Sequence, residues 1–144
     1  MDRLTPERRS WLMSRVTSKN SVAEMRVRRA AHALGLRFRL HRRDLPGTPD
    51  LVFPRYRIVL FVHGCFWHRH PRCRMATTPK SHIQFWQEKF DRNVERDRTV
   101  LLELKRLGWL PNVIWECETK KSDALAKLLR RIFRQKRNMR KCNK

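Results

Sequence analysis

One apolar segment determines which architectures this chain can adopt. The segment YRIVLFVH, residues 56–63, is rich in β-branched and aromatic residues and is mostly apolar on both of its faces. A strand of this kind must be covered on both sides, which is typical of a central strand in a sheet packed between helices. The segments LVF, residues 51–53, and PNVIWE, residues 111–116, predict two further strands.

A helix is expected before these strands. The sequence SVAE, residues 21–24, fits a capping box, in which Ser21 caps the helix start and Glu24 bonds back to the Ser21 amide. Apolar residues then recur at helical spacing as far as Gly35, which is a good helix stop.

Two more helices are expected after the central strand. A long amphipathic pattern runs from Ile83 to near Gly108, and a last helical pattern covers residues 124–133. The last dozen residues are basic, and we expect them to fray. The order helix, strands, helix, strand, helix predicts an α/β sandwich with the sheet between helices.

The chain carries a large positive charge. Its 35 Lys and Arg residues outnumber 13 Asp and Glu, which gives a net charge of +22 and a pI near 11.5. A compact domain with this charge repels itself, so a strongly anionic partner is expected, either nucleic acid or an anionic membrane. No apolar run could span a bilayer, and MDRLTPERRS lacks the apolar core of a signal peptide, so we expect a cytoplasmic protein.

The segment VHGCFWHRHPRC, residues 62–73, concentrates residue types that bind metals. Cys65, His70 and Cys73 are close enough in sequence to converge on one ion. Cys117 directly follows one strand as Cys65 follows another, and neighbouring strands would bring those two ends together. The four residues therefore predict a closed, structural Zn2+ site. The alternative is a set of small buried cysteines and a surface histidine.

Other residues supply the parts for catalysis. Asp50 begins one strand after the turn sequence PGTPD, His63 ends the next strand, and His68 follows five residues later. A carboxylate at a sheet edge can hold Mg2+, which polarises a scissile phosphate and activates water. A nearby imidazole can move a proton near neutral pH. Each residue alone also has an ordinary explanation, since Asp commonly caps turns.

Four segments in this order resemble the very short patch repair endonucleases, the Vsr family: LPGTPDLVF, VHGCFWHRH, FWQEKFDRNVERD and GWLPNVIWEC. The resemblance covers most of the chain. It implies a restriction-endonuclease-like fold, with a mixed central sheet flanked by helices. It also implies an enzyme that nicks DNA on the 5′ side of the thymine in T·G mismatches, which arise when 5-methylcytosine deaminates.

The resemblance also implies roles for individual residues. Asp50 is the implied Mg2+ ligand, together with the backbone carbonyl of Val62, where threonine is familiar in the family. His68 is the implied catalytic histidine and His63 a supporting active-site group. Glu24 is implied to orient or hydrate the metal site, and its role in the helix cap remains the alternative.

The resemblance extends to the zinc ligands and to the DNA contacts. The structural zinc ligands it implies are Cys65, His70, Cys73 and Cys117. Phe66, Trp67 and Trp86 are implied to insert into the duplex beside the mismatch, with Met13 as a wedge from the other side. For these aromatic residues, packing in the core is the alternative.

The expected organisation is a basic arm at residues 1–20, an endonuclease domain at 21–137 and a basic tail at 138–144, in which Cys142 is a free thiol. We expect a monomer, associated with the bacterial nucleoid, that binds mismatched double-stranded DNA, and mismatch-repair proteins are candidate partners. A zinc-stabilised DNA-binding protein without catalysis is one alternative, and a basic RNA-binding protein is another. Neither would need Asp50, His63 and His68.

Overall fold

The computed structural model describes Glu7 and residues 21–142, with side chains as far as residue 134. The predicted basic arm therefore lies, apart from Glu7, outside the described residues. In chain order the elements are α2 (Val22–Ala33), β1 (Arg39–Leu40), β2 (Leu51–Phe53), β3 (Ile58–His63), α3 (Ile83–Arg106), β4 (Leu110–Trp115), the 3-10 helix η1 (Glu116–Thr119) and α4 (Ser122–Cys142).

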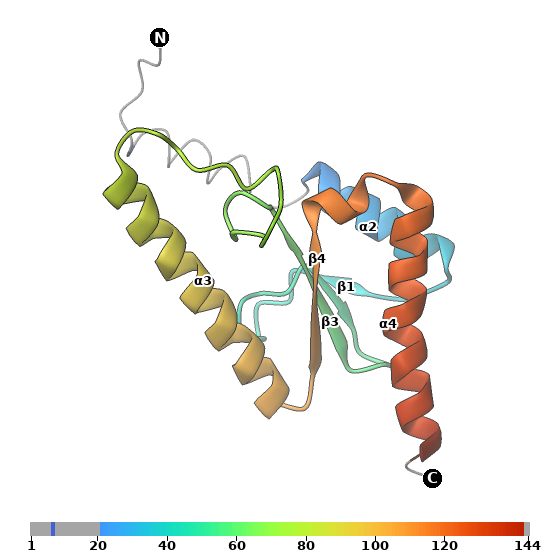
Figure 1. The fold of residues 1–144 in the computed structure, drawn as a ribbon. Coiled ribbons are helices and arrows are strands. Elements are labelled where there is room, and N and C mark those ends of the chain that lie inside the picture. The colour runs from blue at the N-terminus through green and yellow to red at the C-terminus, as the bar shows by residue number, and fades with distance from the viewer. Residues whose placement is uncertain (1–6, 8–20, 143–144) are drawn as a thin grey trace.

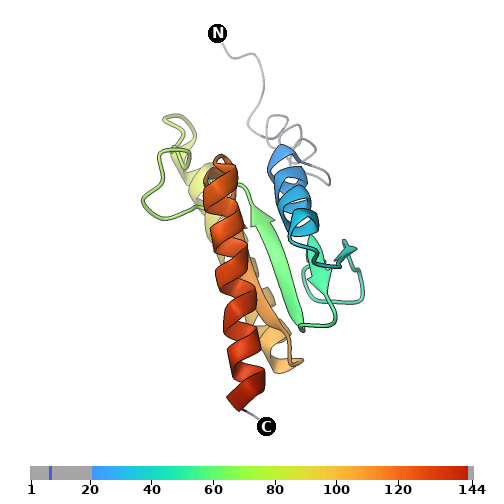
Figure 2. The same ribbon diagram turned by 90° about the vertical axis from the view of Figure 1, so that its right-hand side faces the viewer.

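The strands form one mixed sheet in the order β1-β2-β3-β4. The pairs β1–β2 and β2–β3 are antiparallel, whereas β3 and β4 are parallel. Helix α3 lies on one face of the sheet, and α2 and α4 lie on the other (Figure 1). The turned view shows α4 alongside β3, with α2 next to them (Figure 2). The predicted α/β class is confirmed: the described residues form a mixed sheet with helices on both faces.

Strand β3 is the centre of the structure, as its apolar sequence predicts. Successive side chains point to opposite faces, so β3 supplies two cores. Ile58 and Leu60 pack with residues of α2 and α4. Val59 and Phe61 pack with Leu104 of α3 and with Trp109. Burial on both faces explains why this segment needs apolar residues at nearly every position.

The helix caps agree in part with the sequence prediction. The Ser21 hydroxyl accepts a hydrogen bond from the Glu24 backbone N–H at 3.2 Å, so the predicted cap is confirmed. Gly35 follows the helix with a φ of +74°, the left-handed conformation that glycine adopts at helix ends. Helix α4 continues to Cys142, beyond the helical pattern of residues 124–133, and fraying of the last dozen residues stays a prediction. No helix of the described residues combines the length and apolarity needed to cross a bilayer.

The turn before Asp50 generates a stability prediction. Gly47 has a φ of +73°, and a Cβ placed there would lie 2.5 Å from a methyl carbon of Val100 on α3. Gly35 has a similar φ, but a Cβ there would meet nothing within 4 Å. We expect Gly35→Ala to cost about 1–2 kcal/mol for the left-handed backbone alone. Gly47→Ala should cost about 1–3 kcal/mol more, because it also overpacks the contact with α3.

Urea unfolding of the two variants and of the unchanged protein measures these costs. Equal losses for Gly35→Ala and Gly47→Ala would show that the turn does not pack closely against α3.

Candidate functional site

Three groups of metal-ligand residue types lie where β3 and β4 end. In each group the ligand atoms lie within 4.8 Å of one another. The parallel register pairs His63 with Trp115, so the chain leaves both strands at the same edge of the sheet. The groups are Cys65, His70, Cys73 and Cys117; His63, His68 and Asp97; and Glu24, His41 and Asp50.

The first group has the donor set of a structural zinc site. The sulfurs of Cys65 and Cys117 lie 3.7 and 3.4 Å from His70 Nδ1. Two such ligands of one tetrahedral Zn2+ lie about 3.6 Å apart, given the usual bond lengths. The Trp115 ring stacks on His70 with centroids 4.3 Å apart, which orients the imidazole. The four residues that the sequence singled out are therefore brought together, and they fit Zn2+.

Two of the three thiols of this group, those of Cys65 and Cys117, are costly to ionise without a cation. Burial raises the pKa of Cys65 to about 12. Burial also raises the pKa of Cys117, and the neighbouring Cys73 contributes to that rise. A bound cation would favour the thiolates, so cation affinity and thiol deprotonation are linked at this site.

The second group joins two histidines to an aspartate of α3. The His63 and His68 rings are stacked nearly parallel, with centroids 3.8 Å apart. His68 Nδ1 lies 2.7 Å from Asp97 Oδ2. Burial, followed by the charge of His68, lowers the pKa of His63 to about 3, so His63 is neutral at neutral pH.

The contact with Asp97 fixes how His68 carries its proton. A carboxylate can only accept, so Nδ1 is the protonated nitrogen and Nε2 is left for another partner. His63 supports one face of the His68 ring without carrying charge itself. The pair His68–Asp97 therefore has the arrangement of an oriented proton-transfer group.

Asp97 was not assigned a role from sequence. It ends the element NVERD, which was recognised as a distinctive motif. A signal was present: Trp86, Phe90, Asn93 and Asp97 recur at helical spacing and therefore share one face of α3. The structure agrees, because the Asn93 side-chain amide donates to the Trp67 carbonyl at 3.2 Å on that same face.

The third group places two carboxylates side by side. Asp50 Oδ2 accepts a hydrogen bond from the Val62 backbone N–H at 2.7 Å. This contact uses the Val62 amide. The role implied for the Val62 carbonyl, as a Mg2+ ligand, stays a prediction. Glu24 is only 3% exposed, and its Oε1 lies 2.8 Å from His41 Nε2. Its other oxygen accepts a hydrogen bond from Arg28.

The Glu24 carboxylate therefore belongs to this cluster, while the Ser21 hydroxyl serves the helix cap. His41 was also missed from sequence. It has a φ of +47°, which non-glycine residues seldom adopt, and its backbone N–H donates to the Asp50 carbonyl at 3.2 Å. Since β1 has only two residues, no periodic pattern pointed to this position.

The two carboxyl groups have opposite pKa shifts. Burial raises the pKa of Asp50 to about 7, and the adjacent Glu24 adds to that rise. Burial opposes ionisation of Glu24 as well, but hydrogen bonding to His41 and the positive charge of Arg28 lower its pKa overall. A divalent cation between the oxygens would favour the ionised form of both, which is the donor chemistry that suits Mg2+.

The second group and Asp50 of the third group line one cleft. Its volume is about 780 Å³, and its lining includes Asp50, His63, His68 and Asp97. Helix α3 adds the basic residues Lys89, Arg92 and Arg96 to the same lining. A carboxylate that could hold a cation, an oriented imidazole and basic groups that could bind phosphates thus share one space.

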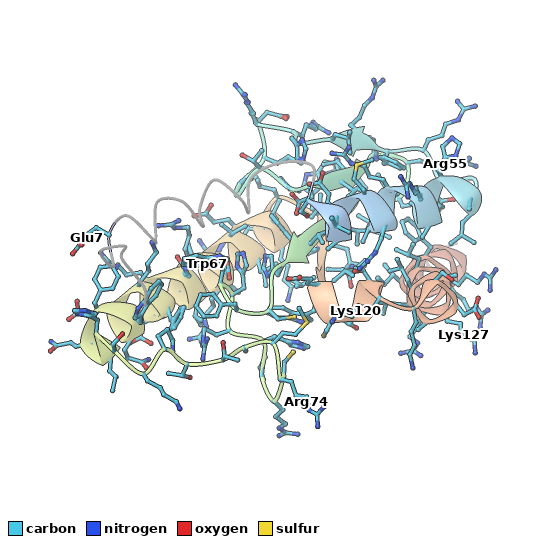
Figure 3. The ribbon with its side chains drawn as sticks, turned by 90° about the horizontal axis from the view of Figure 1, so that it is seen from above. Glu7, Arg55, Trp67, Arg74, Lys120 and Lys127 are labelled. Carbon is cyan, nitrogen blue, oxygen red and sulfur yellow. The ribbon has the colours of Figure 1, made fainter. Side chains whose placement is uncertain are left out.

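The predicted wedge residues form a cluster beside this cleft. The side chains of Trp67 and Trp86 are only 8% and 3% exposed, and both pack with Phe90. The partly buried Phe66 packs against this cluster. Figure 3 shows Trp67 beside α3. In the free protein the two tryptophans have the core packing that was the alternative, and their insertion into DNA stays a prediction. Met13 lies outside the described residues.

Known proteins with similar sequences agree on one family. The family model described as DNA mismatch endonuclease Vsr matches residues 1–74. The type II nicking enzyme V.XorIIP of Xanthomonas oryzae pv. oryzae is 52% identical over 132 residues, 92% of this chain and 96% of that protein. The DNA mismatch endonuclease Vsr of Escherichia coli (strain K12) is 41% identical over 109 residues, 76% of this chain and 69% of that protein. The type II nicking enzyme V.NmeAIP of Neisseria meningitidis is 37% identical over 134 residues, 93% of this chain and 95% of that protein.

Burial of the Asp50 carboxyl generates a pH prediction. Its folded pKa of about 7 exceeds the ordinary 3.8, so between these pH values the folded protein holds a proton that the unfolded chain has lost. The contribution of Asp50 to the free energy of unfolding is therefore full below the ordinary pKa and falls as pH rises toward about 7. Without added divalent cation, the unchanged protein should lose more stability from about pH 5 to about pH 8 than Asp50→Asn.

Urea unfolding at the two pH values measures this difference. Asp44→Asn is the matched control, because a hydrogen bond from Arg42 lowers the pKa of that exposed carboxyl. If the unchanged protein and Asp50→Asn lose equal stability, Asp50 is not the carboxyl with the raised pKa.

Proposed function

This chain belongs to the Vsr family of DNA mismatch endonucleases, and from that premise we propose that it nicks DNA 5′ of the thymine in T·G mismatches. Such mismatches arise where 5-methylcytosine has been deaminated. The observation that carries the proposal is the shared cleft, whose lining joins Asp50 and the His68–Asp97 pair with basic residues of α3, while the buried Glu24 lies beside Asp50. A restriction-endonuclease-like fold is part of the proposal, supported by the mixed sheet with helices on both faces.

The cation site would be built by Asp50 and Glu24. The oxygens of the two carboxyl groups are adjacent, and burial and the charge of Glu24 raise the pKa of Asp50. A divalent cation bound between them would offset this repulsion and favour the ionised form of Asp50. Mg2+ bound there would supply positive charge to the scissile phosphate and an activated water. Arg28 and His41 hold the Glu24 carboxylate in place through the contacts already described. The Val62 carbonyl is proposed as a further ligand.

The proton-transfer group is His68. Asp97 holds its Nδ1–H, so Nε2 is the atom that exchanges a proton with the reacting phosphate or water. His63 stays neutral and stacks on the ring, which keeps the imidazole in one orientation. Lys89, Arg92 and Arg96 would hold the flanking phosphates of the strand, since they line the same cleft.

Mismatch selectivity is proposed to come from Phe66, Trp67 and Trp86. A weakened T·G step is cheaper to open than a paired one, so ring insertion there favours the mismatch. The buried Trp67 indole N–H has no acceptor among the described residues, although buried indoles usually find one. That unused donor is consistent with a ring whose final contacts are made on DNA.

The zinc site is proposed to be structural. Four protein ligands leave no open position for water, so Zn2+ would stabilise the loop after β3 and not take part in the reaction. The loop holds Phe66, Trp67 and His68 between the ligands Cys65 and His70. Zinc binding would therefore position both the proposed wedge and the proposed proton-transfer group.

Three substitutions test the catalytic assignment. Asp50→Asn removes charge from the cation site, so nicking of a T·G duplex with Mg2+ should be lost. His68→Ala should lower the nicking rate by about 10²–10⁴-fold, the usual contribution of general acid–base catalysis. Asp97→Asn should also lower it, because the Asn amide can donate to Nδ1 and so stabilise the wrong tautomer of His68. Nicking is followed on gels with a strand-specific label, and a T·A duplex should remain intact.

Asp44→Asn is the control for charge, because Asp44 is an exposed carboxylate in the loop before Asp50. Its nicking rate should equal that of the unchanged protein. Binding of the T·G duplex should survive in Asp50→Asn and His68→Ala, since basic and aromatic residues supply most of the binding surface. Full nicking by Asp50→Asn would remove this residue from the active site. A protein that binds T·G duplexes but never nicks them would be the non-catalytic DNA-binding protein.

Metal analysis tests the zinc proposal. The purified protein should hold about one Zn2+ per chain. Cys73→Ala should lower both the zinc content and the melting temperature, because it removes one of four ligands. Cys142→Ala is the matched control, since it removes a cysteine outside the group and should change neither quantity. Full zinc content and unchanged melting in Cys73→Ala would overturn the ligand assignment.

A further inference from the structure

The most basic helix of this protein does not line the cleft. Helix α3, which lines the cleft, has six Lys or Arg residues against five Asp or Glu, so its charge is nearly balanced. Helix α4 has eight Lys or Arg residues against one Asp. The proposed reaction in the cleft therefore leaves the most basic element of the described chain without a role.

The described part of α4 separates apolar and basic residues by face. Its core side is buried against the sheet through Leu125, Leu129, Ile132 and Phe133. Four basic residues recur at helical spacing and are exposed: Lys127, Arg130, Arg131 and Arg134. We name these four the α4 basic face. Within the described residues no ion pair involves any of them.

This face lies on the far side of the sheet from the cleft. Helix α3 covers one side of the sheet and α4 covers the other (Figure 1). Seen from above, Lys127 and Arg55 are labelled at the end of the molecule opposite Trp67 (Figure 3). A duplex held in the cleft would therefore not lie along the α4 basic face unless it bent around the protein.

A basic pocket adjoins α4. Tyr56 packs edge to face on Phe133, with ring centroids 5.0 Å apart, and this brings the turn after β2 against the helix. The pocket beside that turn has a volume of about 860 Å³ and is lined by Arg37, Arg39 and Arg55, with no acidic residue in its lining. The positive surface thus extends beyond the helix itself.

Like charges held together repel one another, and a bound polyanion offsets that cost. The phosphodiester backbone of DNA presents regularly spaced negative charges and releases condensed counterions when cations bind it. We propose that the α4 basic face binds the phosphate backbone of a second duplex segment, separate from the one in the cleft and without reading its sequence. This proposal rests on the proposed DNA endonuclease function, because that function brings the protein to DNA.

A two-duplex capture experiment tests the proposal. A short T·G duplex is fixed to a surface and saturated with the protein in buffer without Mg2+. A matched duplex with a fluorescent label is then added, and its capture is measured at several salt concentrations. The unchanged protein should capture the second duplex, with a binding constant that falls steeply as salt rises.

The variant Arg130→Gln, Arg131→Gln, Arg134→Gln removes three charges and keeps the helix. It should reduce capture of the second duplex at least about tenfold and flatten the salt dependence by about three in the log–log slope. Its affinity for the fixed T·G duplex should change far less. The control variant Arg43→Gln, Lys105→Gln, Arg106→Gln removes the same charge from exposed positions elsewhere and should retain capture.

Other outcomes would overturn the proposal. Failure of the unchanged protein to capture a second duplex at low salt would exclude the α4 basic face as a binding site. Equal loss of capture in the control variant and the α4 variant would exclude it as well. Two protein molecules per pair of duplexes, counted by mass photometry, would assign the capture to protein pairing instead.

Vesicles of phosphatidylglycerol form a separate arm of the experiment. Loss of vesicle binding in the α4 variant, with DNA capture unchanged, would identify a membrane surface as the partner. Equal affinity for fixed T·G and T·A duplexes would count against the proposed function and leave the capture result standing.

Discussion

Strands β3 and β4 pair in parallel from Ile58 opposite Leu110 to His63 opposite Trp115, and the candidate site depends on this pairing. Because both strands run the same way, the chain leaves them at one edge of the sheet. Cys65 and Cys117 follow the two strand ends directly, so a single strand pairing brings the two halves of the Cys/His group together. The same edge carries His63, and the loop that starts there carries His68. An antiparallel pairing would place these residues at opposite ends of the sheet.

The second constraint is electrostatic. Glu24 comes from α2 and Asp50 directly precedes β2, and burial opposes the ionisation of both carboxyl groups. The structure lowers that cost for Glu24 through Arg28 and His41, but it leaves Asp50 with a raised pKa. The raised pKa of Asp50 lowers the stability of the folded protein at neutral pH. Such an arrangement is expected where the groups serve a ligand, since perturbed pKa values concentrate at functional sites.

Local sequence patterns predicted the parts of this protein that local physics determines. The apolar run of β3, the Ser21 cap and the limits of α3 depend on nearby residues, and all of them are confirmed. Convergence of Cys65 with Cys117 was predicted because it follows from strand pairing alone. Asp97 and His41 were missed because their roles depend on how α3 and the short β1 pack against distant residues. Burial of Trp67 and Trp86 was only the alternative prediction. The sequence alone does not show whether an aromatic side chain packs in the core or is exposed to solvent.

The distribution of charge bears on selectivity if the cleft recognises a mismatch. Discrimination between two duplexes is a difference of affinities, and attraction to phosphates is the same for both. A strongly basic cleft would add affinity to every duplex and would hold matched DNA as firmly as mismatched DNA. The nearly balanced charge of α3 limits that common attraction, so ring insertion at the weakened step can decide which duplex remains bound. Helix α4 carries eight Lys or Arg residues against one Asp, and this charge would supply general DNA affinity apart from the surface that must discriminate.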